Sequence, residues 1–254
     1  ILPGNVASAT AAVGYNVANS CRFNDGDSAY MHKTPGSAGS LTTWTLSVWL
    51  KRGNLGAEHP FFSGADPSTS SHRDLIRFNS DNTLNIYING TVYRTTNRKF
   101  RDVSAWYHIV VNWDTTNGTA GSRVKLYVNG TEETAFSTSA DPAEDAESNI
   151  NRDTNQRVGR EEAGTFYDGY MAEVCFIDGT IYGPTSFGEF DSDSPTIFKP
   201  IDVSGLTFGT NGFYLDFEAS DNLGNDANGG TDLTEVNLAA ADQATDTPTN
   251  NFAT

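Results

Sequence analysis

Two apolar runs with an alternating pattern lie close together near the middle of the chain. The first covers residues 106–114 and the second residues 123–128, with a Gly-, Asn-, Ser- and Thr-rich loop between them. Every second side chain in each run is apolar, and successive side chains of an extended strand point to opposite faces. The Asn129-Gly130 pair after the second run is a strong signal for a tight turn. We therefore predict a long antiparallel hairpin with one apolar face at the centre of the fold.

Further short runs of the same kind predict an all-β chain. Their number exceeds the roughly seven strands of a small immunoglobulin sandwich, and no repeat of about 20–50 residues is present. We therefore predict a two-sheet antiparallel jelly-roll sandwich. We assign residues 1–14 to an N-terminal arm, residues 15–219 to the sandwich, and residues 220–254 to a polar linker or an extended tail against the domain.

The chain is acidic, with 32 acidic and 16 basic residues and a formal net charge of −16. Such a surface repels phosphate backbones, so nucleic acid is excluded as the main partner. The acidity fits either solubility in salty or crowded surroundings or a metal-binding surface. No apolar run is long enough to cross a membrane, so no membrane insertion is expected. Because the sequence begins with Ile1 rather than Met, we expect it to be one part of a longer polypeptide.

The two cysteines, Cys21 and Cys175, lie far apart in the sequence, and each sits in an apolar run. We expect both to be small buried residues of the packing. A disulfide that closes the sheet is the alternative, and it would require Cα atoms within about 7 Å of each other. Neither a C-x-x-C motif nor a zinc-type histidine spacing is present.

Four sequence blocks occur in order at residues 44–51, 106–111, 124–130 and 166–174. Together they resemble the concanavalin A-like, laminin-G-like jelly rolls. Residues 20–30, 186–189, 208–217 and 246–252 are similar to laminin-G-like proteins of bacteriophages, especially marine ones, and this resemblance covers nearly the whole chain. Residues 229–234 depart from it, because the relatives tend to carry a Gly-Asn-rich turn followed by a Trp there.

The resemblance raises the possibility of a laminarinase-type hydrolase, which needs two carboxyl groups about 5–5.5 Å apart for retention. The nearest candidates are the alternating acids Glu189, Asp191 and Asp193, but the third acid of the family's Glu-x-Asp-x-Glu pattern is an Asp here. We favour a solvated acidic loop. No Gly-x-Ser-x-Gly elbow is present, and we expect His108, within a strand, to be a packed residue.

Calcium is the one cofactor that the resemblance suggests, and no motif requires any cofactor. Laminin-G-like domains commonly bind Ca²⁺ at the rim through carboxylates and backbone carbonyls. The candidate ligands are acids in loops or at strand ends, although Asp is also a favoured turn residue. They are Asp25, Asp27, Asp66, Asp114 and Asp168.

Carbohydrate binding is the other chemistry that fits. Sugar sites on β sandwiches use exposed aromatic rings together with short polar side chains, whereas the alternative for each ring is plain sheet packing. The candidate aromatics are Trp49, Tyr87, Tyr93, Tyr127, Phe166 and Tyr167.

From the narrower resemblance we predict a non-enzymatic phage virion protein, a tail-fibre, head-fibre or decoration component on the virion surface. Its partners would be host-surface glycans or neighbouring virion subunits. A homo-oligomer is expected, and phage fibres are usually trimers, although no residue here specifies a trimer. The alternatives are a secreted polysaccharide hydrolase of the laminarinase type and a purely structural spacer.

Overall fold

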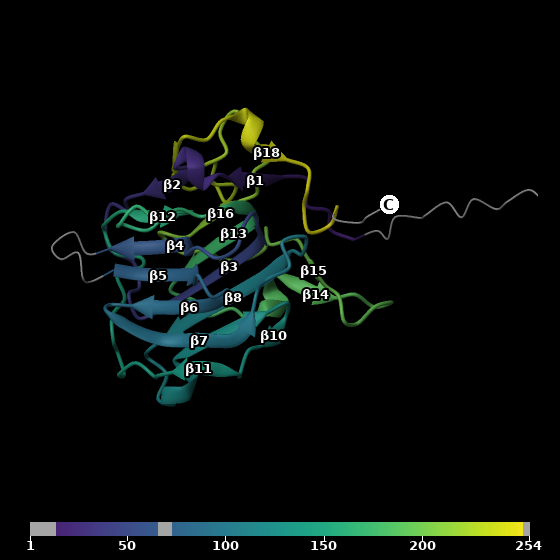
Figure 1. The fold of residues 1–254 in the computed structure, drawn as a ribbon. Helices are drawn as coiled ribbons and strands as arrows, with labels where there is room; N and C mark the ends of the chain where they lie inside the picture. Colours follow the sequence, from purple (N-terminus) through teal and green to yellow (C-terminus); the bar gives the residue numbers. More distant parts are fainter. Residues whose placement is uncertain (1–13, 66–72, 251–254) are drawn as a thin grey trace, which may run out of the picture.

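The computed structural model describes residues 14–65 and 73–250, and this part of the chain is built from β-strands and four short 3₁₀ turns. Two antiparallel sheets pack face to face, and a small hairpin projects from one end (Figure 1). The predicted two-sheet antiparallel jelly-roll sandwich is confirmed. No helix in the described ranges is long and apolar enough to span a bilayer.

Sheet A has the strand order β10–β9–β8–β3–β13–β1–β18, with β16 also paired to β13, and sheet B has the order β11–β7–β6–β5–β4–β12–β2–β17. The strands of sheet A are β1 (Ser20–Phe23), β3 (Thr43–Arg52), β8 (Tyr107–Asp114), β9 (Val124–Val128), β10 (Thr131–Glu132), β13 (Gly169–Asp178), β16 (Phe213–Leu215) and β18 (Gln243–Ala244). Those of sheet B are β2 (Tyr30–Lys33), β4 (His59–Ala65), β5 (Arg73–Phe78), β6 (Thr83–Ile88), β7 (Thr91–Lys99), β11 (Phe136–Ser139), β12 (Gln156–Val158) and β17 (Thr234–Val236). The projecting hairpin is β14 (Gly188–Phe190) and β15 (Phe198–Pro200), and the 3₁₀ turns are η1 (Asp25–Asp27), η2 (Ala120–Ser122), η3 (Pro184–Ser186) and η4 (Ala240–Asp242).

The predicted central hairpin is β8 and β9, which pair antiparallel with Val111 opposite Leu126 and Trp113 opposite Val124. These apolar side chains all point into the core between the sheets. The turn after β9 is also as predicted, because Asn129 and Gly130 adopt φ values of 48° and 77°, the left-handed region that a type I′ turn requires.

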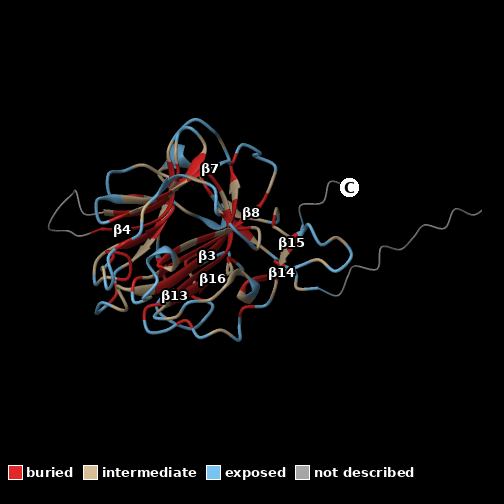
Figure 2. Cartoon of the chain, turned by 90° about the horizontal axis from the view of Figure 1, so that it is seen from below, coloured by how far each residue is buried: buried red, intermediate tan, exposed pale blue. Residues whose placement is uncertain are grey.

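The core lies between the inner faces of the two sheets, and Figure 2 shows the facing strands as buried. The two large rings Trp44 and Trp113, opposite each other on β3 and β8, stack at 6.2 Å between centroids. The pattern of β3 matches the prediction, since Trp44, Leu46, Val48 and Leu50 face the core.

The cysteines lie on opposite faces of sheet A. Cys21 belongs to the core between the sheets, whereas Cys175 packs with Val110 and Tyr214 on the outer face. Both are buried free thiols, so the expectation of buried packing residues is confirmed and the disulfide alternative is wrong.

Strand β13 carries a bulge at Glu173, where the pairing with β3 shifts register. Glu173 has φ = 50°, and the bulge separates the half of β13 that pairs with β1 from the half that pairs with β16. Glu173 Oε2 accepts hydrogen bonds from the hydroxyls of Tyr214 at 2.6 Å and Tyr15 at 3.1 Å. Burial raises the pKa of this carboxyl to about 7.

Asp74 connects three segments at one end of sheet B. Its carboxylate accepts from the backbone N–H of Asn89 at 2.8 Å, from that of Ile150 at 3.0 Å, and from the backbone and side-chain nitrogens of Asn149. Asp74 is fully buried. The turn between β6 and β7 and the segment before β12 are therefore both fixed to β5 by one side chain.

The segment from residue 220 to residue 250 lies against the sandwich. Leu223 and Leu233 belong to the core, while β17 and β18 each add an outermost strand to a sheet. The chain then meets its own beginning, because the Val17 backbone N–H donates to Thr249 Oγ1 at 2.9 Å. The two ends of the described chain are therefore neighbours on the outer face of sheet A.

Candidate functional site

Two of the aromatics proposed for sugar binding are not accessible. Trp49 is 3% exposed on the outer face of sheet A, with its ring centroid 4.8 Å from that of His108 and 6.2 Å from that of Phe198. Tyr167 is completely buried, and its hydroxyl donates to the Lys51 carbonyl at 3.0 Å. The prediction is wrong for these two rings, because the β14–β15 hairpin covers the first and the core encloses the second.

The remaining tyrosines of that prediction lie on three different surfaces. Tyr93 packs into the core edge with its ring 5.4 Å from Trp113, and Tyr127 lies on the outer face of sheet A. Tyr87 lies on the outer face of sheet B, opposite Leu75. All three are half-buried, and the structure does not bring them together.

The proposed calcium ligands are also divided between separate places. Asp25 and Asp27 share the η1 turn, and the backbone N–H of Asp25 bonds to the Asp168 carboxylate. Burial and the nearby Asp25 raise the pKa of Asp168. Asp168 lines a hollow of about 310 Å³ together with Arg22 and Lys51, and these two positive charges oppose the binding of a divalent cation there.

Asp114 cannot join this group. It lies opposite Thr43 at the start of β3, whereas Gly169, next to Asp168, lies opposite Arg52 at the end of β3. Nine residues of strand separate them, which is about 30 Å. Asp66 lies outside the described residues. In residues 14–65 and 73–250, no three His, Cys, Asp or Glu side chains gather as metal ligands.

The acids of residues 189–193 lie on the projecting hairpin. Glu189 and Asp191 both pair with Lys199, and Asp191 accepts the backbone N–H groups of Asp193 and Ser194. These contacts hold an exposed turn. His108 is fully buried, bonds to Ser47 Oγ at 2.8 Å, and has its pKa lowered by burial to about 3, so it is a packed residue as predicted.

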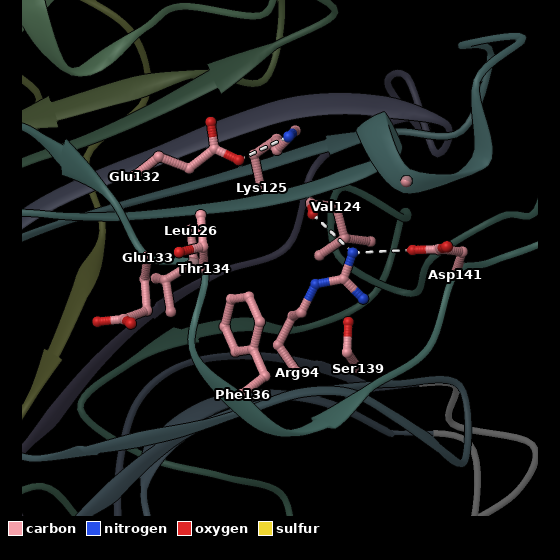
Figure 3. Close-up of a pocket in the computed structure, with 11 residues that line it drawn as sticks. Arg94, Val124, Lys125, Leu126, Glu132, Glu133, Thr134, Phe136, Ser139 and Asp141 are labelled. Atoms are coloured by element: carbon pink, nitrogen blue, oxygen red, sulfur yellow. Dashed lines mark hydrogen bonds and ion pairs between the residues drawn. The ribbon is translucent and has the colours of Figure 1, made fainter.

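A cavity of about 210 Å³ opens between the sheet edges formed by β7 and β11 on one side and β9 and β10 on the other (Figure 3). Arg94 lies across it and is already occupied by the chain itself. Its guanidinium donates to the carbonyls of Val124 and Ala140 and to Asp141, and its Cζ lies 5.5 Å from the Phe136 ring centroid. The arrangement braces the two sheets and leaves Arg94 little capacity for a ligand.

The outer face of sheet B carries an aromatic cluster on β2, the strand next to the outermost strand β17. Val158 pairs with Met31 and both enter the core, so the neighbouring pair Arg157 and His32 points outward. Tyr30 shares the face of His32, and the two rings stack at 5.7 Å.

The hairpin that follows β12 completes this cluster. Arg160 forms an isolated bridge with Phe166, and its Cζ lies 4.7 Å from the Tyr30 ring centroid and 5.4 Å from that of Phe166. The Tyr30 and Phe166 rings lie 6.1 Å apart. All four residues are half-buried, so their edges reach solvent. We call Tyr30, His32, Arg160 and Phe166 the arginine slot.

Of the slot residues, the sequence pointed only to Phe166. Tyr30 and His32 alternate in a short strand, which marks them as sharing a face, but nothing in the sequence places them beside residues 160–166. Their contact depends on the pairing of β2 with β12, two strands about 130 residues apart in the chain.

Comparison with known proteins identifies a family model and several solved structures that are similar to this chain. A family model described as "Concanavalin A-like lectin/glucanases superfamily" matches residues 24–181, more than half of the chain. A Bacteroides ovatus structure with a proposed carbohydrate-binding role is 16% identical with a TM-score of 0.56, and the match covers 91% of this chain and 60% of that one. A comparison with curated proteins finds no match.

Two other solved structures are similar at lower TM-scores. A native heptameric SAP-like pentraxin from Limulus polyphemus is 13% identical, with 66% of this chain and 80% of that chain covered and a TM-score of 0.47. Domains LG4–5 of the mouse laminin α1 chain are 8% identical, with 66% and 43% covered and a TM-score of 0.44.

Proposed function

The chain belongs to the concanavalin A-like lectin/glucanase superfamily, and from that premise we propose that it is a carbohydrate-binding module without hydrolase activity. The arginine slot is the observation that supports this most directly. Two aromatic rings and a cation lie together at an open sheet face, which combines apolar surface for a sugar ring with donors for its oxygens.

The arrangement of carboxyl groups supports binding rather than hydrolysis. A glycosidase holds two carboxyl groups across one bound sugar, at about 5–5.5 Å for retention or about 6.5–9.5 Å for inversion. Glu189 and Asp191 are instead paired with Lys199 on an exposed hairpin. We expect no release of reducing ends when the chain is incubated with polysaccharide, and any background release should be the same in Glu189→Gln.

We further infer that the module works on the surface of a phage virion, as part of a fibre or a decoration protein. The sequence resemblance to phage laminin-G-like proteins motivates this role, and the arrangement of the ends is compatible with it. Both ends of the described chain lie on the outer face of sheet A, whereas the slot lies on the outer face of sheet B. A subunit joined through its ends would present the slot away from its attachment, towards a host glycan. Absence of the chain from purified particles, measured by mass spectrometry, would argue against this placement.

The binding proposal is tested by a glycan array probed with the wild-type chain and with Tyr30→Ala. We expect saturable wild-type binding, and about a tenfold or greater loss of affinity in the variant, because the ring that covers Arg160 and contacts the sugar is removed. Tyr182→Ala is the matched control, since it removes a half-buried tyrosine from the opposite outer face.

Excess EDTA separates this site from a calcium-assisted one. Binding at the slot is expected to survive EDTA, whereas binding that is lost with EDTA would depend on a divalent cation and would argue against the slot as the sugar site. An array without any bound glycan would overturn the binding proposal and favour the structural spacer.

A further inference from the structure

Most arginines on the outer face of sheet B form an ion pair with a glutamate, and one does not. Arg77 pairs with Glu58 at 2.7 Å, Arg73 with Glu161 at 3.6 Å, and Arg157 with Glu162. These pairs are expected in a chain with twice as many acidic as basic residues.

Arg160 has neither a hydrogen bond nor an ion pair from its guanidinium to any described residue. Glu161 and Glu162 follow it directly in the sequence, and each forms its ion pair with another arginine, while the buried Glu161 Oε2 has no hydrogen-bond partner among the described residues. The slot region therefore contains three arginines, Arg73, Arg157 and Arg160, against two glutamates, in a protein whose net charge is −16.

The rings fix Arg160 without neutralising it. Tyr30 and Phe166 contact the guanidinium within about 6 Å, the range of a cation–π interaction, which leaves the full charge and the N–H donors in place. A guanidinium presents its donors as a rigid planar fork that matches the two oxygens of a carboxylate or a sulfate.

Arg157 lies beside the slot and is already paired with Glu162. Its side chain is more than nine-tenths buried beside His32, and its Nε has no hydrogen-bond partner among the described residues. The Nε of Arg160 is also buried and unpartnered within that part of the chain. Both Nε atoms are enclosed by the protein, so the donors that an anion from outside can reach are the terminal nitrogens of the half-buried Arg160.

We propose that the slot binds an acidic sugar, whose carboxylate or sulfate ester accepts hydrogen bonds from Arg160 while the sugar ring packs on Tyr30 and Phe166. This inference rests on the proposed function and narrows its ligand class. The net charge of −16 repels polyanions at long range, so recognition depends on the short-range fork and not on general attraction.

The test compares charged polysaccharides with their uncharged counterparts, using the full chain. The carboxylate arm contains polygalacturonate and alginate, each paired with its carboxyl-reduced form. The sulfate arm contains chondroitin sulfate and dextran sulfate, paired with desulfated chondroitin and with dextran. We expect at least one charged member to bind about tenfold or more tightly than its counterpart, and the arm in which this occurs identifies the oxyanion.

The variants Arg160→Gln and Arg160→Lys separate the fork from the charge. Arg160→Gln is expected to remove the preference for the charged member. Arg160→Lys retains the positive charge but not the planar pair of donors, so it should keep only part of that preference. Arg101→Gln, at an exposed arginine outside the slot, is the matched control and should change nothing. Unchanged unfolding midpoints show that each variant is folded.

The outcomes distinguish this inference from the function on which it rests. Binding of neutral glycans on the array, with no charged polysaccharide preferred over its counterpart, overturns the acidic ligand and leaves carbohydrate binding standing. A charged preference that survives Arg160→Gln moves the anion site away from the slot. Absence of binding to every glycan and polysaccharide overturns both proposals.

Discussion

Replacing Asp74 by alanine is expected to lower the free energy of unfolding by about 3–5 kcal/mol, because several buried N–H donors lose their acceptor and each unpaired donor costs about 1–3 kcal/mol. The carboxylate binds the backbone N–H groups of Asn89, Asn149 and Ile150. Burial raises the pKa of Asp74 to about 6, so the group is ionised at neutral pH and accepts through both oxygens. Urea denaturation at pH 7, followed by circular dichroism, measures the loss.

A matched exposed aspartate tests whether burial is the cause. Asp102 accepts the backbone N–H and the hydroxyl of Ser104 in an exposed turn. Asp102→Ala should therefore leave the denaturation midpoint almost unchanged. If Asp74→Ala behaves like Asp102→Ala, the three segments are not held together by the Asp74 carboxylate.

The second large effect is a dependence of stability on pH that disappears in Glu173→Gln. The pKa of Glu173 is raised from 4.5 to about 7, so the folded state binds this proton more tightly than the unfolded state does. Its contribution to stability is complete below pH 4.5 and is lost as the pH rises towards and through 7. The full loss is about 3 kcal/mol, at ~1.4 kcal/mol per pH unit.

The measurement is the free energy of unfolding of both proteins from pH 4.5 to 8.5. The glutamine is neutral throughout and still offers an oxygen to the hydroxyls of Tyr15 and Tyr214, so the variant should become progressively more stable than the wild type as the pH rises. All other groups, including Asp74, titrate in both proteins and cancel in the difference. A difference that stays constant with pH would show that folding does not raise the pKa of Glu173.

The strand pattern could be predicted from the sequence because it depends on local alternation. The residues of β3 and of the β8–β9 hairpin that share an apolar face are those that enter the core. The edges of the sheets were harder to predict. Residues 131–150 include β11, which has no buried residue and therefore no apolar alternation that would mark it as a strand in the sequence.

The candidate site could not be predicted, because alternation shows that residues share a face but not what covers that face. The alternation of β3 places Trp49 on the face away from the core, which predicts an exposed ring, but in the structure Phe198 of β15 packs over it. Phe166 has no distinctive pattern, yet it lies beside Tyr30 because β12 pairs with β2. Asp114 and Asp168 are equally ordinary strand-end acids in the sequence, and only the register of β3 places them at opposite ends of the sheet.

The contact between Val17 and Thr249 has a consequence for how this sandwich can be combined with other proteins. When the first and last residues of a domain lie side by side, the domain can be inserted into a surface loop of another protein. The two points of insertion then need be no farther apart than the hydrogen-bonded residues Val17 and Thr249. The same geometry would permit a circular permutant in which a short linker joins residue 249 to residue 17 and new ends are opened in the exposed turn between β14 and β15. Either rearrangement leaves the slot untouched on the far sheet.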